Sequence, residues 1–231
     1  RKNEKAAKIA AFALVAALLI SAVEVPDFIT AGASKRELPI YSVERDQKMV
    51  SLSFDAAWGN EDTSLLIDIL GKYNVRATFF VIGQWAERYP ESVKALSDAG
   101  HEVMNHSDDH AHFNTLTADQ IVSNINAASD RIEAVTGKRP TLFRPPYGEY
   151  DDHVIRAVRS MGIEPIQWDV DSLDWKDLSA PEIHKRVTTR VSSGSIILFH
   201  NAAKHTPEAL AGIIEFLISE GYTIVPVSEL I

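Results

Sequence analysis

The strongest constraint on the fold is the regular alternation of short β-prone runs with amphipathic helical segments after residue 48. Strands are predicted at 49–54 and 77–82, with a helix at 63–73 between them. Strands that alternate with helices form a parallel sheet, because a parallel crossover needs a long connection. The pattern continues with strands at 101–104, 142–143, 165–168, 195–199 and 222–227, and with helices at 84–99, 117–136, 150–161, 180–191 and 207–219.

About seven such units in roughly 190 residues predict an α/β fold, a distorted (β/α) barrel of about seven strands. A doubly wound open sheet is the alternative. Polar residues favour the barrel, because each follows a different predicted strand and the carboxyl ends of barrel strands converge on one mouth. These residues are Asp55, His106, Arg144, Asp171 and His200.

The composition restricts the chemistry and the partners. The 231 residues fit one domain and an N-terminal appendage, and we expect a monomer. The sequence contains no cysteine, which excludes thiol nucleophiles, thiolate metal sites and disulfides. The net charge is −9 and the globular part has no Lys/Arg-rich run, so nucleic acid is not an expected partner.

The first residues differ from the rest of the chain. An uncharged apolar run at 9–23 follows four basic residues, which is the pattern of a signal anchor or signal peptide at 1–25. The sequence predicts this segment as an N-terminal hydrophobic helix, then a linker at 26–46 and a folded domain at 47–231. This arrangement places the domain at the cell membrane on the extracytoplasmic side, or outside the cell if the signal is cleaved. A buried helix of a soluble domain is the alternative.

Two histidines four residues apart, His106 and His110, suggest a metal site. Neutral imidazoles at this spacing can place two nitrogens about 2.0–2.1 Å from one Zn²⁺. A pair of surface histidines is the alternative, since a catalytic zinc usually takes three protein ligands. Asp55 follows the first strand, where its carboxylate can act as a general base for a metal-bound water or accept hydrogen bonds at a turn.

Two further clusters carry groups that suit acyl transfer. Two prolines stiffen the loop from Arg144 to Gly148, and Gly148 permits an unusual dihedral. Such a loop suits a backbone N–H held for an oxyanion, and Arg144 can orient a carboxylate. Asp174 beside His200 would raise the pKa of the imidazole and fix its tautomer. Ordinary turns and surface positions are the alternatives for these clusters.

The five clusters, in this order, resemble the polysaccharide deacetylases of carbohydrate esterase family 4 over about residues 46–231, most like the sporulation-associated, membrane-anchored subgroup. The resemblance implies a distorted (β/α) barrel that removes N-acetyl groups from amino sugars of an exported glycan, either peptidoglycan or a chitin-like polymer. It implies Zn²⁺, or another divalent metal such as Co²⁺, as the cofactor. The five clusters are Ser53-Phe-Asp55-Ala56-Ala-Trp58-Gly59, His106-Ser-Asp-Asp-His110, Arg144-Pro-Pro-Tyr147-Gly148, Asp171-Ser-Leu-Asp174-Trp175 and Leu198-Phe-His200.

The resemblance also implies a role for each matching residue. Asp55 matches the catalytic base, and Arg144 the residue that positions it. His106 and His110 match metal ligands. His200 matches the catalytic acid.

The remaining matches surround the substrate. Asp174 matches the residue that tunes the acid, and Tyr147 the residue whose backbone N–H stabilises the oxyanion. Trp175 and Leu198 match the pocket for the acetyl methyl group, although ordinary core packing is the alternative for both.

One position departs from the family pattern. Ala56 stands where the family usually has the aspartate that is its third metal ligand. The loss of one ligand from three weakens metal binding unless another oxygen substitutes. Asp55 or a water is the favoured substitute, and Asp62, Asp109 and His112 are the other candidates.

Three functions therefore remain open. They are an active N-deacetylase, a non-catalytic glycan-binding or scaffold protein with a degenerate metal site, and a hydrolase of another acyl group such as an O-acetyl ester. Trp58 and Trp85 either stack on sugar rings or pack in the core.

Overall fold

The computed structural model describes residues 36–231, and one compact unit spans Glu37–Ile231. The predicted signal segment at 1–25 and the first part of the predicted linker, through residue 35, lie outside the described residues. Within 36–231, no helix has the length and apolar character needed to cross a membrane.

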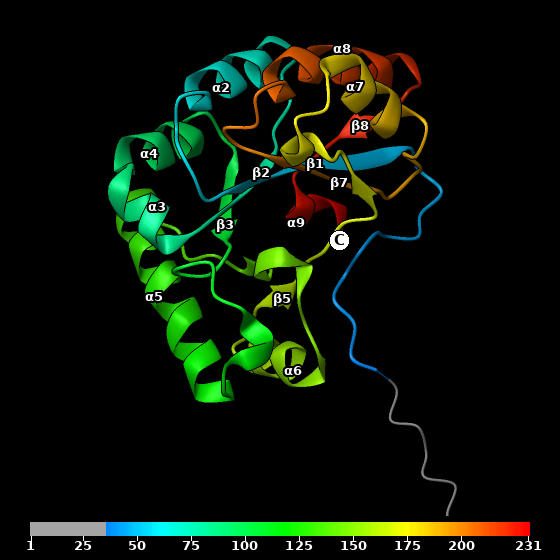
Figure 1. Ribbon diagram of the computed structural model, residues 1–231. Coiled ribbons are helices and arrows are strands. Elements are labelled where there is room, and N and C mark those ends of the chain that lie inside the picture. Colours follow the sequence, from blue (N-terminus) through cyan, green and yellow to red (C-terminus); the bar gives the residue numbers. More distant parts are fainter. Residues whose placement is uncertain (1–35) are drawn as a thin grey trace, which may run out of the picture. The chain divides into compact units, whose positions relative to one another are not determined.

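All strands of the sheet pair in parallel, in the order β5-β4-β3-β2-β1-β7-β6, and β8 pairs with the start of β1. The sheet curls, so the prediction of a distorted (β/α) barrel is confirmed (Figure 1). It stays open between β5 and β6, which are consecutive in the chain but lie at opposite ends of the strand order. The strands are β1 Met49–Ala56, β2 Thr78–Val81, β3 Glu102–Asn105, β4 Leu142–Phe143, β5 Glu164–Pro165, β6 Val170–Asp171, β7 Ile196–His200 and β8 Thr223–Ile224.

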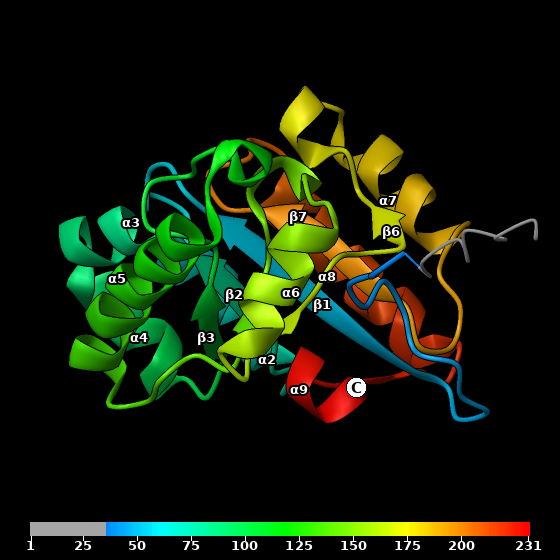
Figure 2. The ribbon, with the colours of Figure 1, turned by 90° about the horizontal axis from the view of Figure 1, so that it is seen from below.

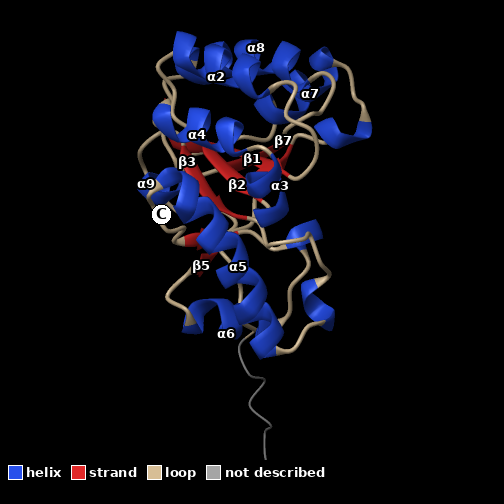
Figure 3. Ribbon diagram, turned by 90° about the vertical axis from the view of Figure 1, so that its left-hand side faces the viewer, coloured by secondary structure: helices blue, strands red, loops and turns tan. Residues whose placement is uncertain are grey.

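Helices cover the outside of the sheet (Figure 3). The predicted helix at 84–99 is divided into α3 and α4 at Tyr89, because Pro90 lacks an N–H and disfavours helical backbone in the residue before it. The long helix α5 begins with a capping box of Thr117 and Gln120. The helices are α2 Thr63–Lys72, α3 Gly83–Arg88, α4 Pro90–Asp98, α5 Ala118–Thr136, α6 Asp152–Ser160, α7 Ala180–Thr188, α8 Thr206–Ser219 and α9 Val227–Leu230, with 3-10 turns η1 Phe113–Thr115, η2 Pro146–Gly148 and η3 Asp174–Lys176.

The segment before β1 pairs with the edge strand β5 and with the residues just before β7. The N–H of Ile40 donates to the carbonyl of Pro165 (2.9 Å), and the N–H of Val43 donates to the carbonyl of Gly194 (3.0 Å). Gly194 has φ +84°, and a Cβ there would lie 1.7 Å from the carbonyl oxygen of Val43, so this approach requires glycine. The compact unit therefore begins at Glu37, ten residues before the predicted boundary at 47.

Successive side chains of β1 face two different cores. Leu52, Phe54 and Ala56 belong to the buried cluster that α2, α7 and α8 also supply, while Ser53 and Asp55 alternate with them. The Ser53 hydroxyl donates to the carbonyl of Ile197 (2.8 Å). A strand buried on both faces is typical of a parallel sheet enclosed by helices, and the alternation directs Asp55 away from the helices.

The short helix α9 closes the amino-terminal end of the strands (Figure 2). Val227 and Leu230 are fully buried in a cluster with Phe80 and Ile196. The N–H of Val227 donates to the hydroxyl of Thr78, the first residue of β2. This packing fills the amino-terminal end of the barrel with apolar side chains.

Candidate active site

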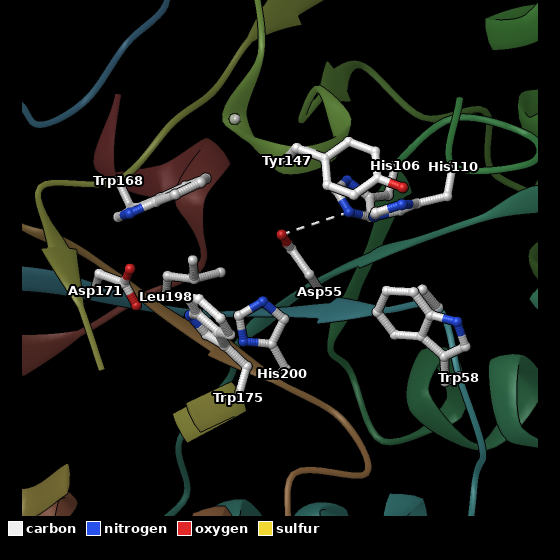
Figure 4. A pocket seen from close by; sticks show the side chains of 12 residues that line it. Asp55, Trp58, His106, His110, Tyr147, Trp168, Asp171, Trp175, Leu198 and His200 are labelled. Atoms are coloured by element: carbon white, nitrogen blue, oxygen red, sulfur yellow. Dashed lines mark ion pairs between the residues drawn. The ribbon is translucent and has the colours of Figure 1, made fainter. Parts of the chain in front are cut away.

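A cavity of about 480 Å³ lies where the carboxyl ends of the strands converge. In Figure 4, Asp55 projects between the imidazoles of His106 and His110 on one side and that of His200 on the other. The cavity is lined by Asp55, Ala57, Trp58, His106, His110, Tyr147, Gly148, Trp168, Asp171, Trp175, Leu198 and His200.

Asp55 is held at the cavity floor by Arg144. The Nη1 group of Arg144 donates to Oδ1 of Asp55 (2.8 Å), and both side chains are buried. Burial alone would raise the pKa of Asp55, but His106, Arg144 and His200 together hold it below its ordinary value. The carboxylate is therefore ionised and immobile at neutral pH.

Arg144 is itself fixed from three further directions. Its Nη2 donates to the hydroxyl of Ser53 (2.9 Å) and to the carbonyl of Gln167 (3.1 Å), and the guanidinium lies 4.2 Å from the ring centroid of Phe80. Burial lowers the pKa of Arg144 and the contact with Asp55 opposes that shift. Arginine remains charged in proteins, so it supplies a fixed positive charge behind Asp55.

The two histidines expected to bind a metal meet at the cavity wall, with ring centroids 5.0 Å apart. The Nδ1 of His106 donates to the carbonyl of Arg144 (2.8 Å), which leaves Nε2 as a lone pair 3.6 Å from Oδ2 of Asp55. The Nδ1 of His110 is buried and has no hydrogen-bond partner. Burial lowers the pKa of His106 and lowers the pKa of His110 to about 4. Both imidazoles are neutral at pH 7, as metal ligation requires.

These donors fit a divalent cation in kind but do not complete a site. Two neutral imidazole nitrogens and one carboxylate oxygen face the same cavity without a proton donor to pair them, and His₂-carboxylate sets bind catalytic zinc. Among residues 36–231, however, no three His, Cys, Asp or Glu side chains already converge as a metal-binding group. Ala56, at the usual third-ligand position, is buried with the helix-facing core and does not line the cavity.

The other candidates for a third ligand lie away from the histidine pair. Asp62 accepts a hydrogen bond from the N–H of Ala202, and Asp109 from the side chain of Asn124. His112 is exposed and stacks on Tyr147. Asp62, Asp109 and His112 do not line the cavity, whereas Asp55 does.

Asp174 holds His200 on the opposite wall. Its Oδ1 accepts a hydrogen bond from Nδ1 of His200 (2.8 Å), and its Oδ2 accepts from the N–H of His200 (2.8 Å) and from the hydroxyl of Thr206 (2.7 Å). Burial lowers the pKa of His200, but the hydrogen bond and charge of Asp174 outweigh it and raise that pKa above its ordinary value. The Nδ1 hydrogen bond leaves Nε2 as the other ring nitrogen for proton transfer.

The rest of the wall is largely apolar. Tyr147 has φ +58°, and a Cβ at Gly148 would lie 2.9 Å from the Trp168 ring, so the loop fits closely against it. Leu198 is buried and Trp175 is half exposed. Both side chains line the cavity, so they lie where the resemblance places a pocket for an acyl methyl group.

The structure brings together all nine residues to which the resemblance gives a catalytic, metal-binding or substrate-binding role. Seven line the cavity, and Arg144 and Asp174 lie directly behind it. Sequence reasoning missed Trp168 of the wall and the partners Ser53, Gln167 and Thr206. Only Ser53 had a signal, because it lies two residues before Asp55 on a strand and so shares its face.

Comparison with known proteins identifies the family of the chain. The family model described as "Polysaccharide deacetylase" matches residues 42–166. Peptidoglycan-N-acetylmuramic acid deacetylase PdaC of Bacillus subtilis is 38% identical over 189 residues, which cover 82% of this chain and 40% of PdaC. Peptidoglycan-N-acetylmuramic acid deacetylase PdaA of the same organism is 31% identical over 188 residues, covering 80% of this chain and 72% of PdaA.

A solved structure that resembles this fold is wild-type BA3943, described as a carbohydrate esterase family 4 pseudoenzyme from Bacillus anthracis. The TM-score is 0.81 at 35% identity, covering 84% of this chain and 68% of BA3943. A BA3943 mutant described as having restored enzymatic activity gives a TM-score of 0.80 at 36% identity, covering 84% and 71% of the two chains. The fold is therefore shared with active deacetylases and with a pseudoenzyme, and the chain spans less than half the length of PdaC.

Proposed function

The chain belongs to the polysaccharide deacetylase family, and on that basis we propose that it is a metal-dependent hydrolase of N-acetyl groups on amino sugars. The expected substrate is an exported glycan, either cell-wall peptidoglycan or a chitin-like polymer. The observation that carries the proposal is a base and an acid on facing walls of one cavity, with pKa values shifted in opposite directions. Such a pair is the requirement for acid–base hydrolysis.

Asp55 serves as the base in this proposal. Arg144 keeps the carboxylate ionised through Oδ1. Oδ2 accepts no hydrogen bond from the described residues, and Nε2 of His106 lies 3.6 Å from it. Oδ2 therefore accepts the proton of the attacking water. The fixed guanidinium also prevents the carboxylate from rotating, so little reorganisation accompanies proton transfer.

His200 serves as the acid. Asp174 keeps Nδ1 protonated and favours the imidazolium, and the second proton, on Nε2, passes to the departing amine. Leu198 and Trp175 enclose the methyl group of the acyl substrate. The backbone N–H of Tyr147 stabilises the oxyanion of the tetrahedral intermediate, in line with the family pattern.

His106 and His110 would hold the divalent metal that polysaccharide deacetylases generally use, and we propose zinc, with cobalt as an alternative. Bound there, the metal supplies Lewis-acid polarisation of the carbonyl and lowers the pKa of a water. The protein's own contribution is two neutral imidazoles. The tautomer of His106 is fixed by the carbonyl of Arg144, and the backbone N–H of His110 is held by the hydroxyl of Ser107.

One observation favours a second candidate, a glycan-binding protein without catalysis. Ala56 removes the usual third ligand, and no metal-binding group of three side chains is formed by residues 36–231. The retained pair of Asp55 with Arg144 and pair of Asp174 with His200 favours the hydrolase, because a binding module does not need opposed acid and base groups.

The deciding experiment measures free amine released by the purified full chain from peptidoglycan and from N-acetylglucosamine oligomers, with Zn²⁺ or Co²⁺ and with a chelator. We expect metal-dependent release that Asp55→Asn abolishes. Asp98→Asn, at an exposed carboxylate paired with Lys94, is the matched control and should retain full activity. A chain that binds metal but releases no amine from either glycan contradicts the hydrolase and favours the binding protein.

Metal binding is tested separately by titration with Zn²⁺. His110→Gln should lower the affinity about 100-fold or more, because it removes one of two imidazole ligands. His112→Gln, which changes an exposed histidine of the same loop, should leave the affinity unchanged. Equal effects of the two changes would contradict the assignment.

We further propose that the N-terminal segment tethers the domain to the cell membrane, with the cavity on the extracytoplasmic side, and that the protein acts in sporulation. The basic and apolar pattern of residues 1–23 supports the tether. Fractionation of cells that express a tagged full chain tests it, since membrane association should disappear when 1–35 is removed.

A further inference from the structure

Exposed aromatic side chains gather around the cavity. Of the large apolar residues in the described part of the chain, the three most exposed are Trp58 (62%), Tyr147 (56%) and Trp175 (55%). All three line the cavity. Exposed apolar side chains that gather around a cavity indicate a ligand-binding site. Tyr147 and Trp175 already have roles in the proposed reaction, whereas Trp58 has none.

The position of Trp58 is fixed by its backbone. The side-chain amide of Asn201 donates to the carbonyls of Trp58 and Gly59, at 2.8 Å each. The same amide accepts from the N–H of Ala57, and the indole N–H of Trp85 donates to the carbonyl of Gly59. Because Asn201 is buried and directly follows β7, the loop that carries Trp58 is anchored to the barrel.

The two tryptophans of this region therefore have opposite environments. Trp85 is buried in the core, and its indole N–H donates within the protein. Of the two roles considered from the sequence, Trp85 therefore has the one in core packing. Trp58 leaves most of its indole in water although the loop beneath it is rigid. A fixed, exposed indole is a preformed surface for a ligand with an apolar face.

The Trp58 ring extends the cavity on the histidine side. It packs edge to face against the ring of His110, with centroids 5.1 Å apart, and Tyr147 packs against His110 at 4.4 Å. In Figure 4, Trp58 lies across Asp55 from Trp168 and Asp171. A sugar whose acyl group enters beside Leu198 would thus have its neighbour in the chain over Trp58.

We propose that Trp58 forms a separate sugar subsite, in which its indole stacks on the C–H face of the pyranose next to the sugar that reacts. The proposal rests on the glycan-directed function of the cavity. Aromatic rings attract the weakly positive C–H groups of a sugar face. The neighbouring Glu61 and Asp62 and the net charge of −9 favour an uncharged pyranose over an anionic ligand. The chain therefore recognises an oligosaccharide of at least two sugars rather than a monosaccharide.

Binding to the full chain is measured by isothermal titration with N-acetylglucosamine, its β-linked tetramer and soluble peptidoglycan strand fragments. Trp58→Ala should weaken binding of the tetramer, or of the strand fragments, about tenfold, the size expected for loss of one aromatic stack. Trp58→Phe should restore most of this loss. Leu65→Ala, at an exposed residue of α2, is the control and should bind like the wild-type chain.

The outcomes separate this inference from the proposed hydrolase. Oligomer binding that depends on Trp58 without any amine release supports the subsite and contradicts the hydrolase. Amine release with the same KM for oligomers in wild type and Trp58→Ala overturns the subsite and leaves the hydrolase intact. Wild-type binding of neither oligomer, or an equal loss for monosaccharide and oligomer in Trp58→Ala, also overturns it.

Discussion

The buried ion pair between Asp55 and Arg144 allows a strong test of how the site is built. Arg144→Met removes the guanidinium but keeps an unbranched side chain next to Phe80. The carboxylate then remains buried without a counter-charge, since its residue is only 6% exposed. Breaking a buried ion pair by removal of one partner costs about 3–5 kcal/mol. We expect Arg144→Met to lower the free energy of unfolding by about 4 kcal/mol at pH 7.

A double-mutant cycle identifies the origin of that loss. Asp55→Asn leaves the guanidinium buried, and the double variant leaves neither charge. If the pair itself is responsible, the double variant is more stable than the sum of the single losses predicts, by about 2–3 kcal/mol. Arg139→Met is the matched control. Arg139 pairs with Asp130 and Glu133 at the surface, so its removal should cost less than about 1 kcal/mol.

The pH dependence has a definite sign. In the wild type the folded-state pKa of Asp55 is lowered, so its contribution is complete above the unfolded value and is lost as the pH falls through the lower folded value. In Arg144→Met, burial is no longer opposed by the guanidinium and the pKa of Asp55 rises. The variant's deficit should therefore be smaller at pH 5 than at pH 7.

The assay is urea unfolding of the chelator-treated chain, followed by circular dichroism at both pH values. A deficit below about 1 kcal/mol would refute the reasoning. So would a coupling energy of zero, or a deficit that does not change with pH. Any of these results would mean that the Asp55 carboxylate is solvated, or accepts a hydrogen bond from another donor, in a way that the structure does not show.

Three other perturbations test separate features. Asp174→Asn should lower the pKa of His200 and reduce kcat about 100-fold, visible as a displaced limb of the pH–rate profile. Burial lowers the pKa of His101 to about 4, so the wild-type free energy of unfolding decreases as the pH falls from 6.5 toward 4. In urea unfolding, the free energy of unfolding of His101→Gln should decrease by about 2 kcal/mol less over that range, after allowance for solvent screening. Ala56→Asp should lower the free energy of unfolding by about 3 kcal/mol without raising Zn²⁺ affinity, as measured by unfolding and metal titration.

The convergence of the site could be predicted because it follows from strand direction alone. In a parallel barrel, residues at the carboxyl ends of strands meet at one mouth, so Asp55, His106 and His200 needed no tertiary information to be placed together. The link between Arg144 and a carboxylate followed from side-chain chemistry. These inferences depend on local periodicity and on residue type, which the sequence contains.

Other features depend on contacts that have no local signal. The segment around Ile40 pairs with β5 through two backbone hydrogen bonds, and an isolated bridge has no periodic pattern to reveal it. Thr206 reaches Asp174 from the start of α8, 32 residues away in the chain. The carbonyl of Gln167 bonds Arg144 through the backbone, and so its residue type carries no information.

The direction of residue 56 combines both kinds of information. In the sequence, positions 55 and 56 are adjacent, and no local pattern shows which of the two side chains faces a metal. In the structure β1 continues through Ala56, which pairs with Val81 and accepts a hydrogen bond from the N–H of Ile82 (3.1 Å). Consecutive side chains of a strand point to opposite faces. A carboxylate at position 56 would therefore enter the helix-facing core unless the strand ended one residue earlier and gave up these contacts. Replacing the missing side chain alone should not rebuild a third ligand, so metal titration of Ala56→Asp also tests where the strand ends.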